Sequence, residues 1–450
     1  MTFGTTILHL LQTGLGSLAA YLAAHVLLCL LPAFFIAGAL MTLIPKEAIT
    51  RYLGKDASKW ISYPAAALGG FVLAVCSCTI MPLFAGIYKK GAGLGPAITF
   101  LFVGPAINIL AISFTGVQIG MDIALARVFL SLIFGVLIGL LMAWIFREDD
   151  ALHNQESSQL FNKTAKIPLK NIIFFTLLLA ILITGTLQVG LFTNTTWSFD
   201  INASWGNHLQ VVLDRLVLAS ASLGIEGVSV QGVILIGLLI LIGITSIKGL
   251  GNVDEGFNRW TTAALTITSL TLLFASIKLS TTLSGFSVGF TGRFFAEVIL
   301  IAGVWISAKR AFSNEVIGSW LWETWRFVKQ ILPILLVGVF TAGMARALIP
   351  GEWIRTIAGR NTVWANFIGV VFGVFMYFPT LVEVPIAQTF LSLGMHRGPL
   401  LAYLLADPEL SFQSILITSS VIGKKKTAVY VVLVTIFSTL SGLLFGWFIA

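Results

Sequence analysis

Residues 70–108 read GFVLAVCSCTIMPLFAGIYKKGAGLGPAITFLFVGPAIN, and this stretch guides the interpretation of the whole chain. It is apolar enough for a membrane, yet it contains two cysteines one residue apart, three prolines and an asparagine. Proline removes a helical hydrogen bond and kinks or ends a helix. Interrupted backbone is tolerated at membrane depth only where protein or a water-filled cavity surrounds it. The stretch therefore predicts a broken, membrane-embedded segment beside a cavity.

The composition of the chain indicates a membrane protein. Of the 450 residues, 57% are hydrophobic and only 10% are charged, whereas soluble domains carry roughly 25% charged residues. Apolar runs of about 20 residues, long enough to cross a bilayer, recur along the whole length. The chain has a net charge of +8. Cytoplasmic loops of membrane proteins are rich in Lys and Arg, and they account for such an excess. The expected environment is therefore the lipid bilayer, and no nucleic-acid partner is expected.

The broken stretch occurs twice. Three prolines recur 303 positions later: Pro82, Pro96 and Pro105 correspond to Pro385, Pro399 and Pro408. Just upstream, LIPKEAITRYLG (43–54) matches LIPGEWIRTIAG (348–359). We therefore expect four parts. These are a first repeat (1–146) with a CSC hairpin and a GPAIN break, a cytoplasmic linker (147–169), central helices (170–310), and a second repeat (311–450) with a PTLVEVP hairpin and a DPELS break.

The distribution of positive charge favours opposite orientations for the two copies. If every apolar segment crosses the membrane, Lys and Arg divide evenly between the two sides. If 62–90 and 363–395 are instead re-entrant hairpins, most of them fall on the inner side, as the positive-inside rule requires. The predicted fold class is an all-α polytopic membrane protein with about ten transmembrane helices, two re-entrant Pro/Gly-broken hairpins and two inverted repeats. Transporters of this design bind substrate near the midplane.

The first copy contributes thiol, hydroxyl and amide groups at its two breaks. Cys76, Ser77, Cys78 and Thr79 precede Pro82, and Asn108 follows Pro105 by one helical turn. Two thiolates favour soft cations and thiophilic metalloids, so Cys76 and Cys78 form a candidate metal or metalloid site. The alternative is that these cysteines pack as small apolar residues. Asn108 could bind substrate or cap the broken helix.

The second copy contributes carboxylates instead. Glu383 precedes Pro385, and Asp407 and Glu409 flank Pro408. A charge inside the membrane costs about 2.5–3.5 kcal/mol on the lenient scale, so such residues usually face a cavity and serve function. We therefore consider all three as proton-coupling candidates, and Glu383 also as a substrate ligand. The alternatives are that Glu383 pairs with Arg127 and that Asp-Pro-Glu only starts a helix.

Enzyme motifs are missing from the sequence. It contains no phosphate-binding G-x-x-x-x-G-K-[ST] loop, no H-E-x-x-H and no dinucleotide fingerprint. We therefore expect no enzyme activity and no cofactor, and any pumping would draw on an ion gradient or a partner protein.

Both copies resemble a known family. The run CSCTIMPLFAGIYKKGAGLGPAITFLFVGPAIN and its counterpart YFPTLVEVPIAQTFLSLGMHRGPLLAYLLADPELS resemble the signature regions of the predicted permeases that include the ArsP-type methylarsenite exporters. The resemblance covers both repeats and implies a multi-pass inner-membrane exporter. It implies that Cys76 and Cys78 are thiol ligands and that Asn108 belongs to the GPAIN element. The chain departs from the pattern at Thr79 and in ADPELS, which adds Asp407 and Glu409.

These observations predict a permease, a secondary transporter of the cell membrane. It would export a small thiophilic solute, such as a trivalent organoarsenical, in exchange for protons. Two alternatives stay open: a transporter of the same fold for another metal ion or an anion, and a membrane subunit of a larger complex. A homo-oligomer is also left open.

Overall fold

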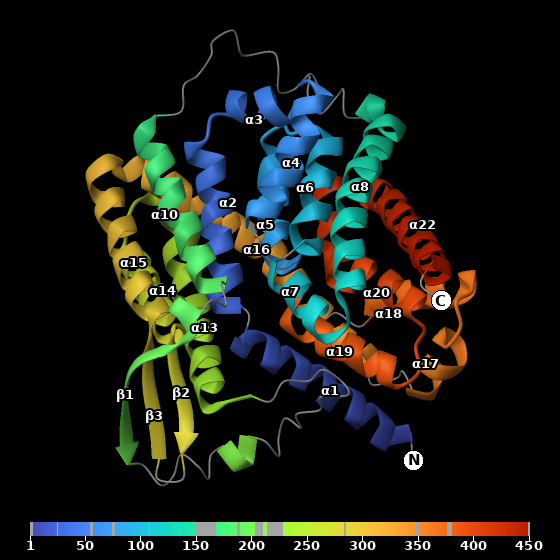
Figure 1. Cartoon of the computed structure of the whole chain (residues 1–450). Helices are drawn as coiled ribbons and strands as arrows, with labels where there is room; N and C mark the ends of the chain where they lie inside the picture. The colour runs from blue at the N-terminus through green and yellow to red at the C-terminus, as the bar shows by residue number, and fades with distance from the viewer. Residues whose placement is uncertain are drawn as a thin grey trace.

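A computed structural model describes residues 3–24, 26–54, 57–73, 77–107, 109–149, 168–186, 190–202, 210–213, 228–282, 285–346, 351–375 and 380–448. Helices dominate these residues (Figure 1). The N-terminal part contains α1 (Phe3–Ala24), the π-helical turn η1 (Val26–Leu30), α2 (Leu31–Leu43), α3 (Lys46–Leu53), α4 (Lys59–Leu73), α5 (Ser77–Lys89), α6 (Leu94–Ala106), α7 (Ile109–Gln118) and α8 (Met121–Ile145).

The central part combines helices with a small sheet. It contains α10 (Leu169–Thr186), α11 (Gly190–Thr193), β1 (Thr195–Asn202), α13 (Val230–Gly249), the 3-10 helix η3 (Leu250–Glu255), α14 (Arg259–Ala275), β2 (Ile277–Thr282), β3 (Gly285–Thr291) and α15 (Gly292–Ala311). The C-terminal part contains α16 (Asn314–Arg346), α17 (Gly351–Ala358), α18 (Val363–Phe375), α19 (Thr380–Ser392), α20 (Arg397–Leu410), α21 (Phe412–Ile422) and α22 (Lys424–Phe448).

The helices confirm an all-α polytopic membrane protein, but fewer of them qualify as spans than the sequence predicts. Within the described residues, five are long and apolar enough to cross a membrane: α8, α10, α13, α16 and α22. The number rises to seven if the bent pairs α1–α2 and α20–α21 each count as one span. Breaks account for much of the difference, because halves such as α6 and α18 have only 13 residues each, short of the roughly 20 that a span needs.

The sequence did not predict the three-stranded antiparallel sheet. Its strand order is β1-β3-β2, with Trp197 and Ile277 both opposite Phe290. The strands extend from one end of the helical body (Figure 1). These strands have only six to eight residues and lie between apolar segments. Their alternation of polar and apolar residues is too short to indicate a strand from the sequence.

Helix bounds recur between the two expected copies. The six described helices α3–α8 begin at residues 46, 59, 77, 94, 109 and 121, and α17–α22 begin at 351, 363, 380, 397, 412 and 424. The offset stays between 303 and 305 throughout. Residues 150–167 of the predicted linker lie outside the described residues. The division into four parts remains a prediction, which these matching bounds support.

The same backbone hydrogen bond closes the base of each hairpin. Gly93 N–H donates to the Leu53 carbonyl at 2.7 Å, and His396 N–H donates to the Ala358 carbonyl at 2.9 Å. Helices α4–α5 and α18–α19 therefore each begin and end at the same end of the helical body. Helices α3 and α17, which precede the two hairpins, lie at opposite ends of that body (Figure 1). This arrangement supports the proposed inversion.

Each hairpin also ends on the same turn. Gly91 and Gly394 adopt φ angles of 92° and 94°, which glycine reaches without a Cβ penalty. In the first copy, Ala92 N–H donates to the Ile87 carbonyl at 3.0 Å, and the second copy has the matching bond from Met395 to Phe390 at 2.9 Å. These bonds form the Schellman motif that ends many helices. Glycine is therefore needed at both positions.

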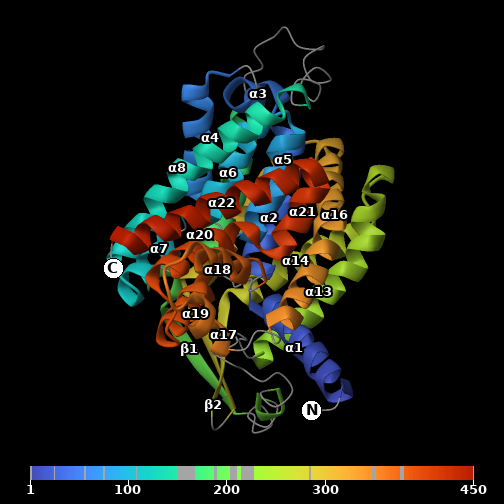
Figure 2. The same cartoon turned by 90° about the vertical axis from the view of Figure 1, so that its right-hand side faces the viewer.

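Glycines also bring the inner helices into backbone contact in both copies. A Cβ on Gly139 of α8 would lie 2.6 Å from the Gly95 carbonyl of α6. A Cβ on Gly442 of α22 would lie 2.5 Å from the Gly398 carbonyl of α20. Small residues let membrane helices approach this closely. Helices α8 and α22 also contact each other, and Figure 2 shows them side by side across the two copies.

Candidate transport site

Arg127 connects the two copies in the interior of the protein. It lies on α8 and is fully buried. Its Nη2 lies 3.1 Å from both carboxylate oxygens of Glu383 on α19. Its Nε donates to the carbonyl of Ala106 at 3.2 Å. One guanidinium thus links the GPAIN break of the first copy to the PTLVEVP hairpin of the second.

Local structure explains both contacts of Arg127. Ala106 is the last residue of α6, and the last carbonyls of a helix have no intrahelical donor. Glu383 lies in the first turn of α19, where the helix dipole favours a negative charge. Of the two interpretations of Glu383 offered by the sequence, the ion pair with Arg127 is therefore observed. Its proposed role in proton coupling remains a prediction.

Glu409 lies within the electrostatic influence of this pair. The residue is 2% exposed, and the charges of Arg127 and Glu383 both act on its carboxylate. Its Oε2 accepts a hydrogen bond from the Tyr430 hydroxyl of α22 at 3.2 Å. Within the described residues, its Oε1 has no hydrogen-bond partner.

Asp407, the third predicted carboxylate, lies near the end of α20, where that helix crosses α18. It is 1% exposed, and a Cβ on Gly373 would lie 3.0 Å from its backbone nitrogen. Glycine at 373 therefore allows the close crossing. The first copy has the same contact between Gly70 and Gly104, where a Cβ on Gly70 would lie 2.9 Å from the Gly104 nitrogen.

Helix α21 starts directly after the DPELS break with buried polar groups. Ser411 caps it by accepting a hydrogen bond from Ser414 N–H at 3.4 Å. Gln413 is 1% exposed, and neither its Nε2 nor its Oε1 has a hydrogen-bond partner among the described residues. Thr418, farther along α21, directs its hydroxyl to Met81 Sδ on α5 at 3.8 Å.

Each hairpin packs against a helix of the other copy. Helix α5 packs against α21 of the second copy, and α19 packs against α7 of the first. Each hairpin arm therefore lies beside the helix that follows the break of the other copy. The two breaks and the two hairpins meet in one region of the protein.

The structure describes the predicted thiol site only in part. Cys76 and Asn108 lie outside the described residues. Ser77 and Cys78 form the start of α5, and only their backbone is described. Thr79, the next residue, is fully buried. Among the described residues, no group of three or more His, Cys, Asp or Glu could hold a metal ion.

The four predicted break prolines lie inside helices, next to the interruptions. Pro82 and Pro385 lie in α5 and α19, five residues after the first residue of each helix. Pro105 and Pro408 lie in α6 and α20, one and two residues before the helix ends. Proline is tolerated best near a helix start, where few hydrogen bonds are lost, and it clashes with the preceding turn elsewhere. The interruptions therefore fall beside these prolines.

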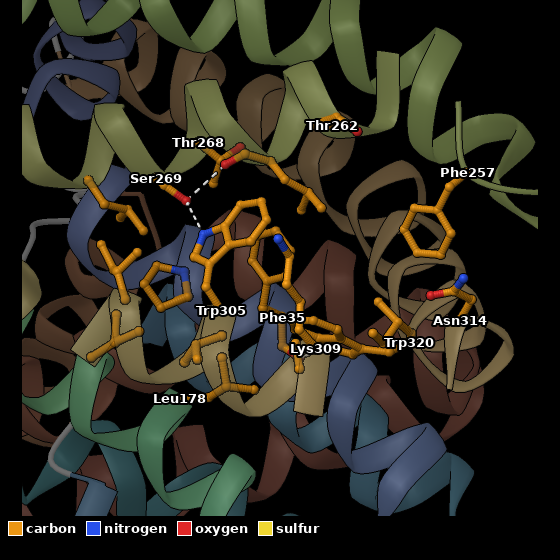
Figure 3. Close-up of a pocket in the computed structure, with 18 residues that line it drawn as sticks. Phe35, Leu178, Phe257, Thr262, Thr268, Ser269, Trp305, Lys309, Asn314 and Trp320 are labelled. Carbon is orange, nitrogen blue, oxygen red and sulfur yellow. Dashed lines mark hydrogen bonds between the residues drawn. The ribbon is translucent and has the colours of Figure 1, made fainter. Parts of the chain in front are cut away.

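Three buried residues of the region, Arg127, Tyr430 and Gln413, are not among the site candidates that the sequence predicts. Arg127 carried a signal, since it is a single positive charge within a 25-residue apolar helix. Tyr430 and Gln413 carried none, because an isolated Tyr or Gln in an apolar segment looks like ordinary packing. A cavity between the central helices also exists, but none of the predicted site residues lines it (Figure 3).

The apolar helices and the buried charges beside the helix breaks are those of a multi-pass transporter of the cell membrane. A family model described as predicted permease, the ArsP type, matches residues 13–447, and the chain belongs to that family. UPF0718 protein MJ0584 of Methanocaldococcus jannaschii is 34% identical over 441 residues, which cover 98% of this chain and 97% of that protein. UPF0718 protein YcgR of Bacillus subtilis is 24% identical over 123 residues, or 27% of this chain and 41% of that protein. No solved structure matches.

Proposed function

We propose that this transporter exports a thiophilic solute, such as a trivalent organoarsenical, in exchange for protons. The observation that supports it best is the buried contact of Arg127 with Ala106 and Glu383. This contact joins the GPAIN break of the first copy to the hairpin of the second. A substrate at this junction can be exposed to either side by small movements of the two copies.

The proposed substrate ligands are Cys76 and Cys78. Helix α5 begins at Ser77, so the two thiols flank a helix start. Helix N-termini stabilise thiolates and make cysteine more reactive. When a trivalent arsenic compound binds two thiols, each new As–S bond displaces one hydroxyl from arsenic, and that hydroxyl leaves as water with the thiol proton. Ser77, Thr79 and Asn108 would line the same site.

Proton coupling needs a separate group, because capture by two thiols leaves the net charge unchanged. Glu383 already pairs with Arg127. Glu409 has a carboxylate oxygen without a hydrogen-bond partner among the described residues, so it can take up a proton without breaking an ion pair. We therefore propose Glu409 as the main proton carrier, with Asp407 beside it on α20. Movement of α20 against α22 would then change the exposure of Glu409.

The test is uptake into everted membrane vesicles that contain the full chain. Methylarsenite, arsenite, zinc and copper are supplied with and without an imposed proton gradient. The expected result is gradient-driven uptake of methylarsenite by the wild type and its loss in Cys76→Ser/Cys78→Ser. Cys29→Ser is the matched control, since Cys29 lies in η1, outside the predicted site. Equal uptake by the double variant and the wild type would rule out thiol capture.

A second candidate is an anion transporter of the same fold. One observation favours it: among the described residues, the Nη1 of the buried Arg127 has no hydrogen-bond partner. A guanidinium can bind an oxyanion through two parallel hydrogen bonds. Under this candidate, Cys76→Ser/Cys78→Ser would keep transport and Arg127→Lys would lose it. The same vesicle assay with labelled phosphate and sulfate separates the two candidates.

A further inference from the structure

A cavity of about 350 Å³ lies between α2, α10, α14, α15 and α16. Its inner wall is apolar and includes Leu178, Ile181, Leu272 and Ile301, as Figure 3 illustrates for Leu178. Ligand sites in proteins typically measure about 300–1,000 Å³. The cavity is therefore large enough for part of a ligand of apolar character.

Two of the polar side chains that line the cavity, Trp305 and Ser269, are already hydrogen-bonded. Trp305 Nε1 donates to Ser269 Oγ at 3.1 Å (Figure 3). Ser269 in turn donates to the carbonyl of Leu265 at 2.9 Å. These bonds occupy the indole N–H and the Ser269 hydroxyl, so few groups of the interior remain for a polar ligand. A hydrocarbon chain is the kind of ligand that fits such an apolar lining.

Apart from Phe257, the exposed residues at the mouth of the cavity are polar. Thr262, Lys309 and Asn314 line it and are exposed. Lys309 is the charged side chain among the described lining residues, and no carboxylate lines the cavity there. Its Nζ lies over the Trp305 ring, 6.0 Å from the ring centre.

More positive charge gathers around this mouth. Lys170 donates from Nζ to the carbonyl of Ala311 at 3.2 Å, two residues beyond Lys309. Asn258, which caps α14, donates to the carbonyl of Lys248 at 3.2 Å. The ends of α10, α13, α14 and α15 therefore meet here, and their basic side chains match the inner surface of a membrane.

We propose that this cavity holds an acyl chain of an anionic phospholipid whose phosphate lies at Lys309. Two helices around the cavity, α10 and α16, are long and apolar enough to cross the membrane, so the bilayer is the nearest source of a lipid. Clusters of Lys and Arg at the cytoplasmic surface attract anionic headgroups. An apolar interior with one cation at its mouth matches both ends of such a lipid. This proposal is independent of the transported substrate.

The test uses the full chain, purified and delipidated in detergent, with bound lipid counted by native mass spectrometry. Phosphatidylglycerol is titrated against phosphatidylcholine. The wild type is expected to retain phosphatidylglycerol preferentially. Lys309→Gln is expected to weaken its retention about fivefold, the effect of one lysine near a lipid surface.

Two further variants complete the test. Lys329→Gln is the matched control, because Lys329 also lies over a tryptophan ring, at 4.9 Å from Trp322, but does not line the cavity. Ala308→Phe fills the cavity from its wall and is expected to remove the bound lipid. A monodisperse elution profile checks that both variants fold.

Three results would overturn the proposal. The first is equal retention of phosphatidylglycerol and phosphatidylcholine by the wild type. The second is unchanged retention in Lys309→Gln and Ala308→Phe. The third is retention of glycerol phosphate alone that equals retention of phosphatidylglycerol, which would indicate a headgroup site without an acyl chain.

Discussion

Arg127 and Glu383, 256 positions apart in the chain, form a buried ion pair. The Nη2 of Arg127 lies 3.1 Å from both carboxylate oxygens of Glu383. Each residue comes from a different copy of the repeated segment. Both are almost fully buried, at 0% and 2% side-chain exposure. Desolvation of two charges is expensive, so such a pair adds little net stability but makes the loss of one partner costly. The loss of either residue is therefore expected to disturb the contact between the two copies.

Removal of one partner of this pair is expected to destabilise the protein strongly. Arg127→Met or Glu383→Gln alone leaves a buried charge without compensation, which typically costs about 3–5 kcal/mol. The double variant Arg127→Met/Glu383→Leu removes both charges and is expected to melt closer to the wild type than either single variant. Melting in detergent, followed by tryptophan fluorescence, measures this. Additive losses in the double variant would contradict the pair as described.

Glu409→Gln is expected to uncouple transport from protons. Glutamine preserves the shape of the side chain but cannot exchange a proton. Uptake driven by an imposed pH gradient should fall to background, while exchange of labelled for unlabelled substrate continues. The control is Glu323→Gln, since Glu323 pairs with Arg326 at the surface at 2.8 Å. A gradient response that survives in Glu409→Gln would remove this residue from the coupling mechanism.

The close helix contacts at glycine predict that a Gly→Ala substitution there lowers the stability of the protein. A Cβ on Gly442 would clash with Asn366 Oδ1 and would lie 2.5 Å from the Gly398 carbonyl. Gly442→Ala should therefore destabilise by about 1–3 kcal/mol through overpacking. Gly237→Ala is the matched control on α13, where nothing lies within 4 Å, and removal of a helical glycine there should stabilise by about 1 kcal/mol. Melting temperatures of the two variants should move in opposite directions.

The hairpin geometry predicts which positions share a side of the membrane. Single cysteines are placed in a variant without native cysteines: Lys59→Cys and Lys89→Cys flank the first hairpin, and Arg360→Cys and Ser392→Cys flank the second. All four native side chains are exposed. An impermeant maleimide is expected to label the first two from the cytoplasmic side and the last two from the outside. Labelling of Lys59→Cys and Lys89→Cys from opposite sides would show that the segment crosses the membrane.

The local features of the fold were largely predictable. The recurring prolines and the LIPKEAITRYLG and LIPGEWIRTIAG runs predicted corresponding segments, and the helix bounds recur at that offset. The burial of Glu383, Asp407 and Glu409 also agrees with their position in apolar runs. The short strands β1–β3 and the cavity behind Trp305 were not predicted. Strands this short and a cavity shared by five helices leave no pattern in neighbouring residues.

The sequence by itself determined that this is a helical membrane protein with two related broken segments, because apolar length, proline position and charge distribution act within a few turns of chain. It also placed Glu383, Asp407 and Glu409 within apolar runs, and all three are buried. Only the tertiary structure decided which residues meet: Arg127 with Ala106 and Glu383, and Tyr430 with Glu409. These contacts join segments that lie far apart in the chain or on different helices. Their geometry depends on how whole helices pack, which no local pattern encodes.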